Sequence, residues 1–198
     1  MAITIGTPTG SNSLSYSHTI PSGTEVLVVG VCVQVGGGNA SPSVTVNGLG
    51  MTNSANGNGN RAISVFTYIK PPTGSQTIAI SHAGSLSDVY SYAITVDEDT
   101  GKELEIGDDT VNLATSSVVV TATASEGVVF DSFAANSAAS AGAGQTQVAS
   151  YTGAFFHYRG SREAHSGADV TMSWSVSGGI AAVEIKPKDT FAPRIAIF

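Results

Sequence analysis

The sequence predicts an all-β fold, an antiparallel β-sandwich or jelly roll. Short runs rich in Val, Ile, Thr, Tyr and Phe alternate with clusters of Gly, Ser, Asn and Pro, at intervals of about ten residues. No segment carries the apolar stripe of an amphipathic helix. The chain of 198 residues is 41% hydrophobic, which is enough for one sizeable core. We therefore predict that residues 1–198 form a single domain.

The strands are predicted from β-branched and aromatic runs that are bounded by turn residues. In chain order, the expected strands are Ala2–Ile5, Leu14–Ile20, Glu25–Val35, Ser43–Asn47, Ala62–Ile69, Gln76–His82, Asp88–Val96, Ser117–Thr123, Gly127–Ala134, Thr146–Tyr151, Ala154–Tyr158, Asp169–Val176 and Ile180–Lys186.

Turn chemistry separates these strands. Asn47-Gly48 and Ser177-Gly178-Gly179 predict tight hairpins, because Gly adopts positive φ at no steric cost and Asn at little. Pro71-Pro72-Thr73-Gly74 predicts a wider corner. The Asn- and Gly-rich segment Thr52–Arg61 is expected to be a flexible, exposed loop, and Phe133–Ala143 also favours a loop.

A faint internal similarity predicts a duplication. Thr24–Gly30 resembles Ser125–Asp131, and later segments match in the same order: Val65–Tyr68 with Phe155–Tyr158, then a closing hairpin at Gln76–Val96 with one at Asp169–Lys186. We expect two related antiparallel strand sets that pack face to face, each burying its apolar face against the other.

The charge balance excludes several partners. Only 12% of the residues are charged, and the net charge is −7 with eight Lys and Arg, which argues against a nucleic-acid footprint and an anionic membrane surface. No apolar run approaches the roughly 18 residues of a membrane span, and no secretion signal precedes the first strand. We expect synthesis in a cytoplasm. Cys32 has no second cysteine to pair with, and its apolar neighbours predict a buried, inert thiol.

Motifs that carry chemistry are missing from the sequence. The acidic residues of Asp97–Glu103 and Asp108-Asp109 suggest calcium, but their spacing does not match an EF-hand loop, and a solvated link between the halves is the simpler interpretation. The four histidines show no metal-ligand spacing, and no Gly-x-Ser-x-Gly elbow or phosphate loop occurs. A Ser-His-Asp triad stays open because its members meet only in space. We predict no enzyme, catalytic residue, metal or cofactor.

Two groups of residues are candidate binding sites. The first consists of Tyr158, Arg159, Arg162 and His165. With Glu163, this segment combines rings, guanidinium groups and a carboxylate, a mixture that suits a carbohydrate if the residues lie in a loop. The alternative is that the rings fill the core and the charges are ordinary surface.

The second group belongs to a C-terminal docking tail, residues 187–198. This tail is unusually apolar, and we assign its interface residues as Phe191, Arg194, Ile195, Ile197 and Phe198. Such a segment can add a strand to its own sheet or to a neighbouring molecule.

The order of several motifs resembles tailed-phage virion proteins of the jelly-roll kind, namely capsid decoration (cement) and tail-associated proteins. The motifs are Val26–Val33, Val44-Thr45-Val46-Asn47-Gly48, Val65–Tyr68, Pro72-Thr73-Gly74, Thr77-Ile78-Ala79-Ile80 and Ala181–Pro187. The resemblance covers roughly residues 24–187. It implies a virion structural protein, capsid decoration above all, that acts as a homo-oligomer (a trimer is favoured) on other virion proteins such as the major capsid protein. The alternative function is a carbohydrate- or receptor-binding module of a tail fibre or surface protein.

Overall fold

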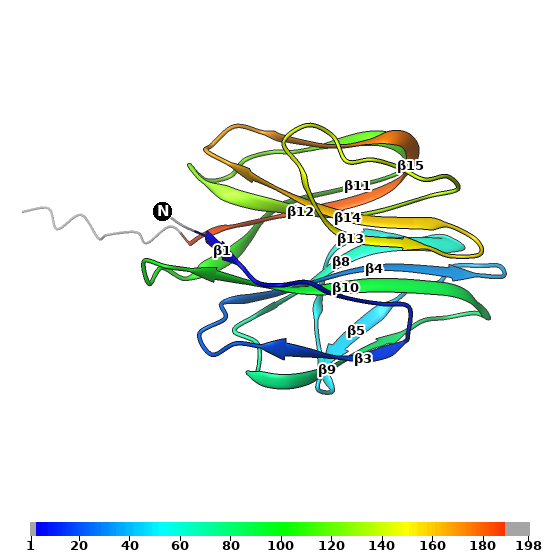
Figure 1. The fold of residues 1–198 in the computed structure, drawn as a ribbon, viewed down its shortest axis with the longest axis horizontal. Coiled ribbons are helices and arrows are strands. Elements are labelled where there is room, and N and C mark those ends of the chain that lie inside the picture. Colours follow the sequence, from blue (N-terminus) through cyan, green and yellow to red (C-terminus); the bar gives the residue numbers. More distant parts are fainter. Residues whose placement is uncertain (1–2, 189–198) are drawn as a thin grey trace, which may run out of the picture.

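The computed structural model describes residues 3–188, which form three antiparallel sheets and no helix (Figure 1). The central sheet runs β1 (Ile3–Ile5), β10 (Leu86–Glu98), β4 (Val26–Val35), β8 (Arg61–Ile69), β7 (Thr52–Gly57), with β2 (Thr9–Ser11) also on β10. The four-stranded sheet runs β3 (Ser15–Ile20), β9 (Gly74–Ser81), β5 (Ser43–Val46), β6 (Leu49–Gly50). The five-stranded sheet runs β11 (Leu104–Val120), β15 (Val170–Pro187), β12 (Gly127–Ala135), β14 (His157–His165), β13 (Thr146–Thr152). The predicted all-β sandwich is confirmed.

The central sheet is covered on both faces (Figure 1). Leu27, Val29 and Val31 of β4 pack with Val44 and Ile78 of the four-stranded sheet in one core cluster. The intervening residues of β4 point to the five-stranded sheet instead. Burial on both faces explains why the β4 sequence is apolar throughout rather than alternating with polar residues.

The two halves of the chain meet at a seam between the central and five-stranded sheets. Val26, Val28 and Cys32 on one side face Phe130 and Val183 on the other. The hydroxyl of Tyr92, from the first half, donates a hydrogen bond of 2.8 Å to the backbone oxygen of Asp131 in the second half.

The five-stranded sheet folds over itself to make a further layer. β11 and β15 are long and irregular, and their outer ends pair with each other, from Ser117 with Ser173 to Val120 with Val170. This outer ribbon covers the face of β12 that points away from the seam. The outer core between them contains Val129, Phe133, Met172 and Trp174. Each half therefore encloses a core of its own in addition to the seam.

Both halves have the same strand order. The path β1-β10-β4-β8-β7 in the central sheet corresponds to β11-β15-β12-β14-β13 in the five-stranded sheet. The residue-by-residue match of the sequence analysis is nevertheless wrong. It pairs Val28 with Val129, but Val28 lies in the seam and Val129 in the outer core. A slip of one residue exchanges the two faces of a strand.

Other sequence-based expectations were also wrong. Thr52–Gly57 is the paired edge strand β7 rather than a loop, and the strand expected at Ala154–Tyr158 begins only at His157 and runs to His165. Ser177–Gly179 makes no hairpin, because β15 continues through it. Gln76–Val96 is no hairpin either, since β9 and β10 belong to different sheets.

The remaining turns were predicted correctly. Asn47 and Gly48 have φ of 49° and 82°, which fits the tight turn between β5 and β6. Pro71–Gly74 connects the central sheet to the four-stranded sheet.

Candidate functional site

The predicted docking residues cannot be placed. Phe191, Arg194, Ile195, Ile197 and Phe198 all lie outside the described residues, so their assignment to an interface stays a prediction.

The four predicted carbohydrate ligands lie on a strand, β14, and not in a loop. Successive residues of a strand point to opposite faces. Tyr158 and Arg162 therefore share the seam side, whereas Arg159 and His165 share the outer side. Arg162 and His165 both line one small pocket at the end of β14, but the structure does not bring all four side chains together.

Two of these side chains are committed to contacts inside the protein. Tyr158 is fully buried, and its hydroxyl lies 3.0 Å from the hydroxyl of Ser132. Arg159 is also buried, and its Nη1 donates to the backbone oxygens of Tyr151 and Tyr158 at 2.8 and 2.7 Å. The ring of Tyr158 and the guanidinium of Arg159 are therefore not available to a ligand.

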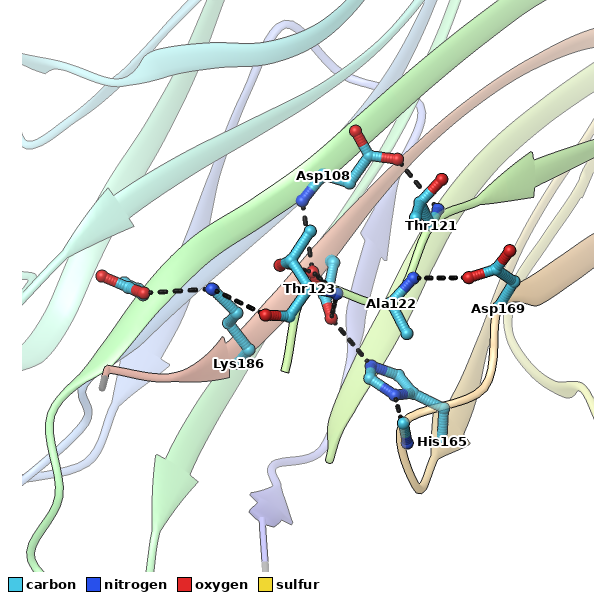
Figure 2. Close-up of polar contacts among 10 residues, drawn as sticks. Asp108, Thr121, Ala122, Thr123, His165, Asp169 and Lys186 are labelled. Carbon is cyan, nitrogen blue, oxygen red and sulfur yellow. Dashed lines mark hydrogen bonds and ion pairs between the residues drawn. The ribbon is translucent and has the colours of Figure 1, made fainter. Parts of the chain in front are cut away.

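The described residue that comes closest to a catalytic group is His165, which faces Glu184 (Figure 2). His165 Nε2 lies 3.0 Å from Glu184 Oε1, and the two side chains are only 3% and 0% exposed. The backbone N–H of Gly167 donates to Nδ1 at 3.3 Å. In a neutral ring the proton is then on Nε2, facing the carboxylate.

The connectivity of this group differs from that of a catalytic triad. In a triad the histidine stands between the hydroxyl and the carboxylate. Here Glu184 stands in the middle, because its Oε2 accepts from the hydroxyl of Thr123 while Oε1 faces His165. His165 therefore has no hydroxyl to activate, and both groups are closed to solvent.

Glu184 instead belongs to a carboxylate clamp, which we define as Asp108, Asp169 and Glu184 acting on residues 121–123. The three consecutive backbone N–H groups of this corner each meet a different carboxylate (Figure 2). The N–H of Thr121 donates to Asp108 at 2.8 Å, that of Ala122 to Asp169 at 3.0 Å, and that of Thr123 to Glu184 at 3.1 Å. The clamp fixes the passage of the chain from β11 to β12.

Neighbouring groups complete the clamp. The N–H of Asp108 donates to Glu184 at 3.2 Å, and Lys186 Nζ lies 3.2 Å from Glu105 and 3.4 Å from the carbonyl oxygen of Thr123. A Cβ at Gly107 would overlap the carboxylate of Glu184, so a side chain there would have to displace the clamp. The sequence analysis had placed Asp108 in a solvated link between the halves, but Asp108 lies in strand β11. The link is the short turn between β10 and β11.

A second buried carboxylate, Asp131, lies in the outer core. It accepts hydrogen bonds from Trp174 Nε1 at 2.8 Å, from the N–H of Ser161 at 2.7 Å and from the hydroxyl of Ser161 at 2.9 Å. Burial raises the pKa of Asp131 to about 7, although these donors act in the opposite direction. The visible sequence signal was an acid inside the apolar run Val128-Val129-Phe130.

Across residues 3–188, no group of three or more His, Cys, Asp or Glu side chains is arranged to hold a metal ion. Within the same range, no helix is long and apolar enough to cross a membrane. No protein-family model, curated protein or solved structure matches the chain.

Proposed function

We propose that this chain is a structural, non-catalytic component of a virus particle, and most specifically a capsid decoration protein of a tailed phage. The observation that carries the proposal is that the buried charged side chains hold the fold together. Asp131, Arg159 and Glu184 all bind neighbouring strands of the same half. Charged groups that hold a scaffold together are not available for turnover.

The proposed mechanism is stabilisation by association. A protein that binds only the assembled particle stabilises it by mass action and needs no reacting group. The rigid part would be the stacked sheets, and the adhesive part the apolar tail that contains Phe191, Ile195 and Ile197. Its partners would be further copies of the chain, as a trimer, and the major capsid protein. The specific placement on a phage capsid rests on the motif resemblance of residues 24–187.

The oligomeric state tests the adhesive role of the tail. We expect light scattering after size exclusion to give an oligomer for the full chain and a monomer for a chain that ends at Lys188. Circular dichroism should show the same β-sheet signal for both, because the truncated chain keeps every strand of the described residues, up to the end of β15 at Pro187. A full chain that stays monomeric at high micromolar concentration, or an oligomer that survives the truncation, contradicts the proposed mechanism.

The particle itself tests the decoration role. Phage particles produced without the chain should release their DNA at a lower temperature than complete particles, and adding the purified chain should restore the difference. Particles with unchanged thermal stability would contradict capsid decoration. Antibody labelling of the chain that is confined to the phage tail would also contradict it and would make the chain a tail protein.

A further inference from the structure

A cleft of about 490 Å³ opens at one end of the seam, where both halves contribute to its walls. Its apolar floor comes from the first half through Ile63 and from the second half through Leu113 and Ala134. The rim is polar, with Asn60 and Arg61 on one side and Asn136 and Ser177 on the other. Its volume lies in the range of small-molecule sites, and junctions between units are a common place for them.

Gly178 and Gly179 allow β15 to pass close to the floor of this cleft. A Cβ on Gly178 would lie 2.4 Å from the backbone oxygen of Ala134, and one on Gly179 would lie 2.2 Å from Ile63 Cδ1. The bend of β15 can therefore approach the floor only without side chains, which leaves its backbone as part of the wall.

Arg61 is fixed in place and still has donors to offer. Nε donates to Gln34 at 2.9 Å, and Nη2 donates to Asn136 at 2.7 Å and to the carbonyl oxygen of Phe155 at 3.2 Å. The guanidinium carbon lies 5.8 Å from the ring centroid of Phe156. Among the described residues, Nη1 has no hydrogen-bond partner, and it is not among the atoms closed to solvent.

The charge and polarity of the lining select the ligand. Among residues 3–188, Arg61 is the sole charged residue that lines the cleft, and no carboxylate lines it. In a chain of net charge −7 this is a local site for an anion. An apolar side chain is nevertheless exposed there: Leu113, which lines the cleft, is 45% exposed. An inorganic anion could pair with Arg61, but it would make no contact with this apolar surface or with the amides of Asn60 and Asn136.

We propose that the seam cleft binds an acidic saccharide, a sugar that carries a carboxylate. The carboxylate would meet the unpartnered Nη1 of Arg61, the hydroxyls would meet the amides of Asn60 and Asn136, and the C–H face of the ring would lie on Leu113. This site is separate from the residues predicted on β14, and it does not depend on the virion role proposed above.

The test is a titration of the isotope-labelled full chain followed by amide NMR shifts. The probes are N-acetylneuraminic acid and glucuronic acid, with glucose as the uncharged comparison. We expect both acids to shift the amides of Gly178 and Gly179 with a Kd of about 1 mM, as is typical of a small site with few contacts. Raising the salt to 0.5 M should weaken binding several-fold, because a partly exposed ion pair is screened.

Variants locate the site. Leu113→Ala and Asn60→Ala should each weaken binding about fivefold without unfolding the chain, since both residues line the cleft and both are exposed. Val119→Ala is the matched control, because Val119 is 54% exposed but does not line the cleft. Arg61→Lys keeps the charge and loses the fork, so binding of the acids should fall at least tenfold. Circular dichroism checks that this last variant is folded; if it is not, the two alanine variants decide.

Three outcomes would overturn the proposal. They are the absence of shifts up to 20 mM of either acid, equal affinity for glucose, and binding that Leu113→Ala and Asn60→Ala leave unchanged.

Discussion

The two halves of this protein use the same strand order and close their sandwiches in different ways. In the first half, the four-stranded sheet is separate, and it covers β4 with aliphatic side chains such as Val44 and Ile78. In the second half, the covering layer is an extension of β11 and β15, and it is held by Asp131 and Glu184. Among residues 3–188, the fully buried carboxylates occur only in the second half. The same strand order can therefore be covered by a layer that packs through aliphatic side chains or by a layer that buried carboxylates also hold.

The largest expected difference between the halves concerns the centre of each sandwich. Asp131→Ala should lower the free energy of unfolding by about 5 kcal/mol at pH 5, because it leaves three buried donors unpaired and a cavity behind. Val29→Ala, at the middle of β4 and also pointing away from the seam, should cost about 2 kcal/mol. Urea denaturation measures both. Equal losses would show that the polar centre has no special role.

The second prediction concerns pH. The pKa of Asp131 is raised from 3.8 to about 7, so the folded protein holds a proton that the unfolded chain has already released between these values. Stability from this group is complete below pH 4 and is lost as the pH rises to about 7, by up to about 4 kcal/mol. Urea midpoints from pH 4 to pH 8 should show this slope for the natural chain. In Asp131→Asn the slope should be smaller by that amount, and an unchanged slope would assign it to other groups.

The third prediction compares one passage between layers in each half. In the second half we choose Gly178, where a Cβ would meet the backbone oxygen of Ala134, so Gly178→Ala should cost about 3 kcal/mol. In the first half we choose the loop between β9 and β10, which is one of several such passages. There Gly84 has φ of 78° but no contact closer than 3.4 Å, so Gly84→Ala should cost about 1 kcal/mol. Thermal unfolding should rank the variants in this order, and the reverse order would refute the close approach.

The smallest expected effect concerns the corners that lead into β4 and β12. The first corner has one carboxylate, Asp97, which accepts from the N–H of Glu25 at 3.0 Å, whereas the second has the three-membered clamp. Glu184→Gln should cost about 2 kcal/mol and speed hydrogen exchange at Thr121 and Thr123, and Asp97→Asn should cost about 0.5 kcal/mol. Exchange at the second corner that Glu184→Gln leaves unaltered would argue against the clamp.

The sequence predicted the strands whose burial leaves a local signature. β4, β5 and β12 are apolar or alternating runs, and all three lie within two residues of their expected bounds. β14 was misplaced because Arg159, Arg162 and Glu163 look like a loop, although the guanidinium of Arg159 bonds to the backbone inside the sheet.

The glycines at the bend of β15 were misread for a different reason. Gly178-Gly179 has the composition of a hairpin turn, but here glycine is needed for close packing, and only the neighbouring strand reveals it.

The polar sites were beyond prediction because their members come from distant parts of the chain. Glu184 lies 61 residues from Thr123 and 76 from Asp108. Only the pairing of β11 with β15 brings them together. The seam cleft is equally invisible, because its floor and rim are shared by segments that are adjacent only once both halves have stacked.

The strand pairs of the two halves do not mix, and this has a consequence for folding during synthesis. In the part of the chain that the structure describes, every ladder of the first half lies within residues 3–98, and every ladder of the second half lies within residues 104–187. On a ribosome, which delivers the N-terminal part first, the earlier sandwich can complete its hydrogen bonding before the later one has been translated. The seam face of the first sandwich, with Val26, Val28 and Tyr92, would be exposed to solvent during that interval. The nascent chain therefore carries an adhesive surface that its own second half covers last.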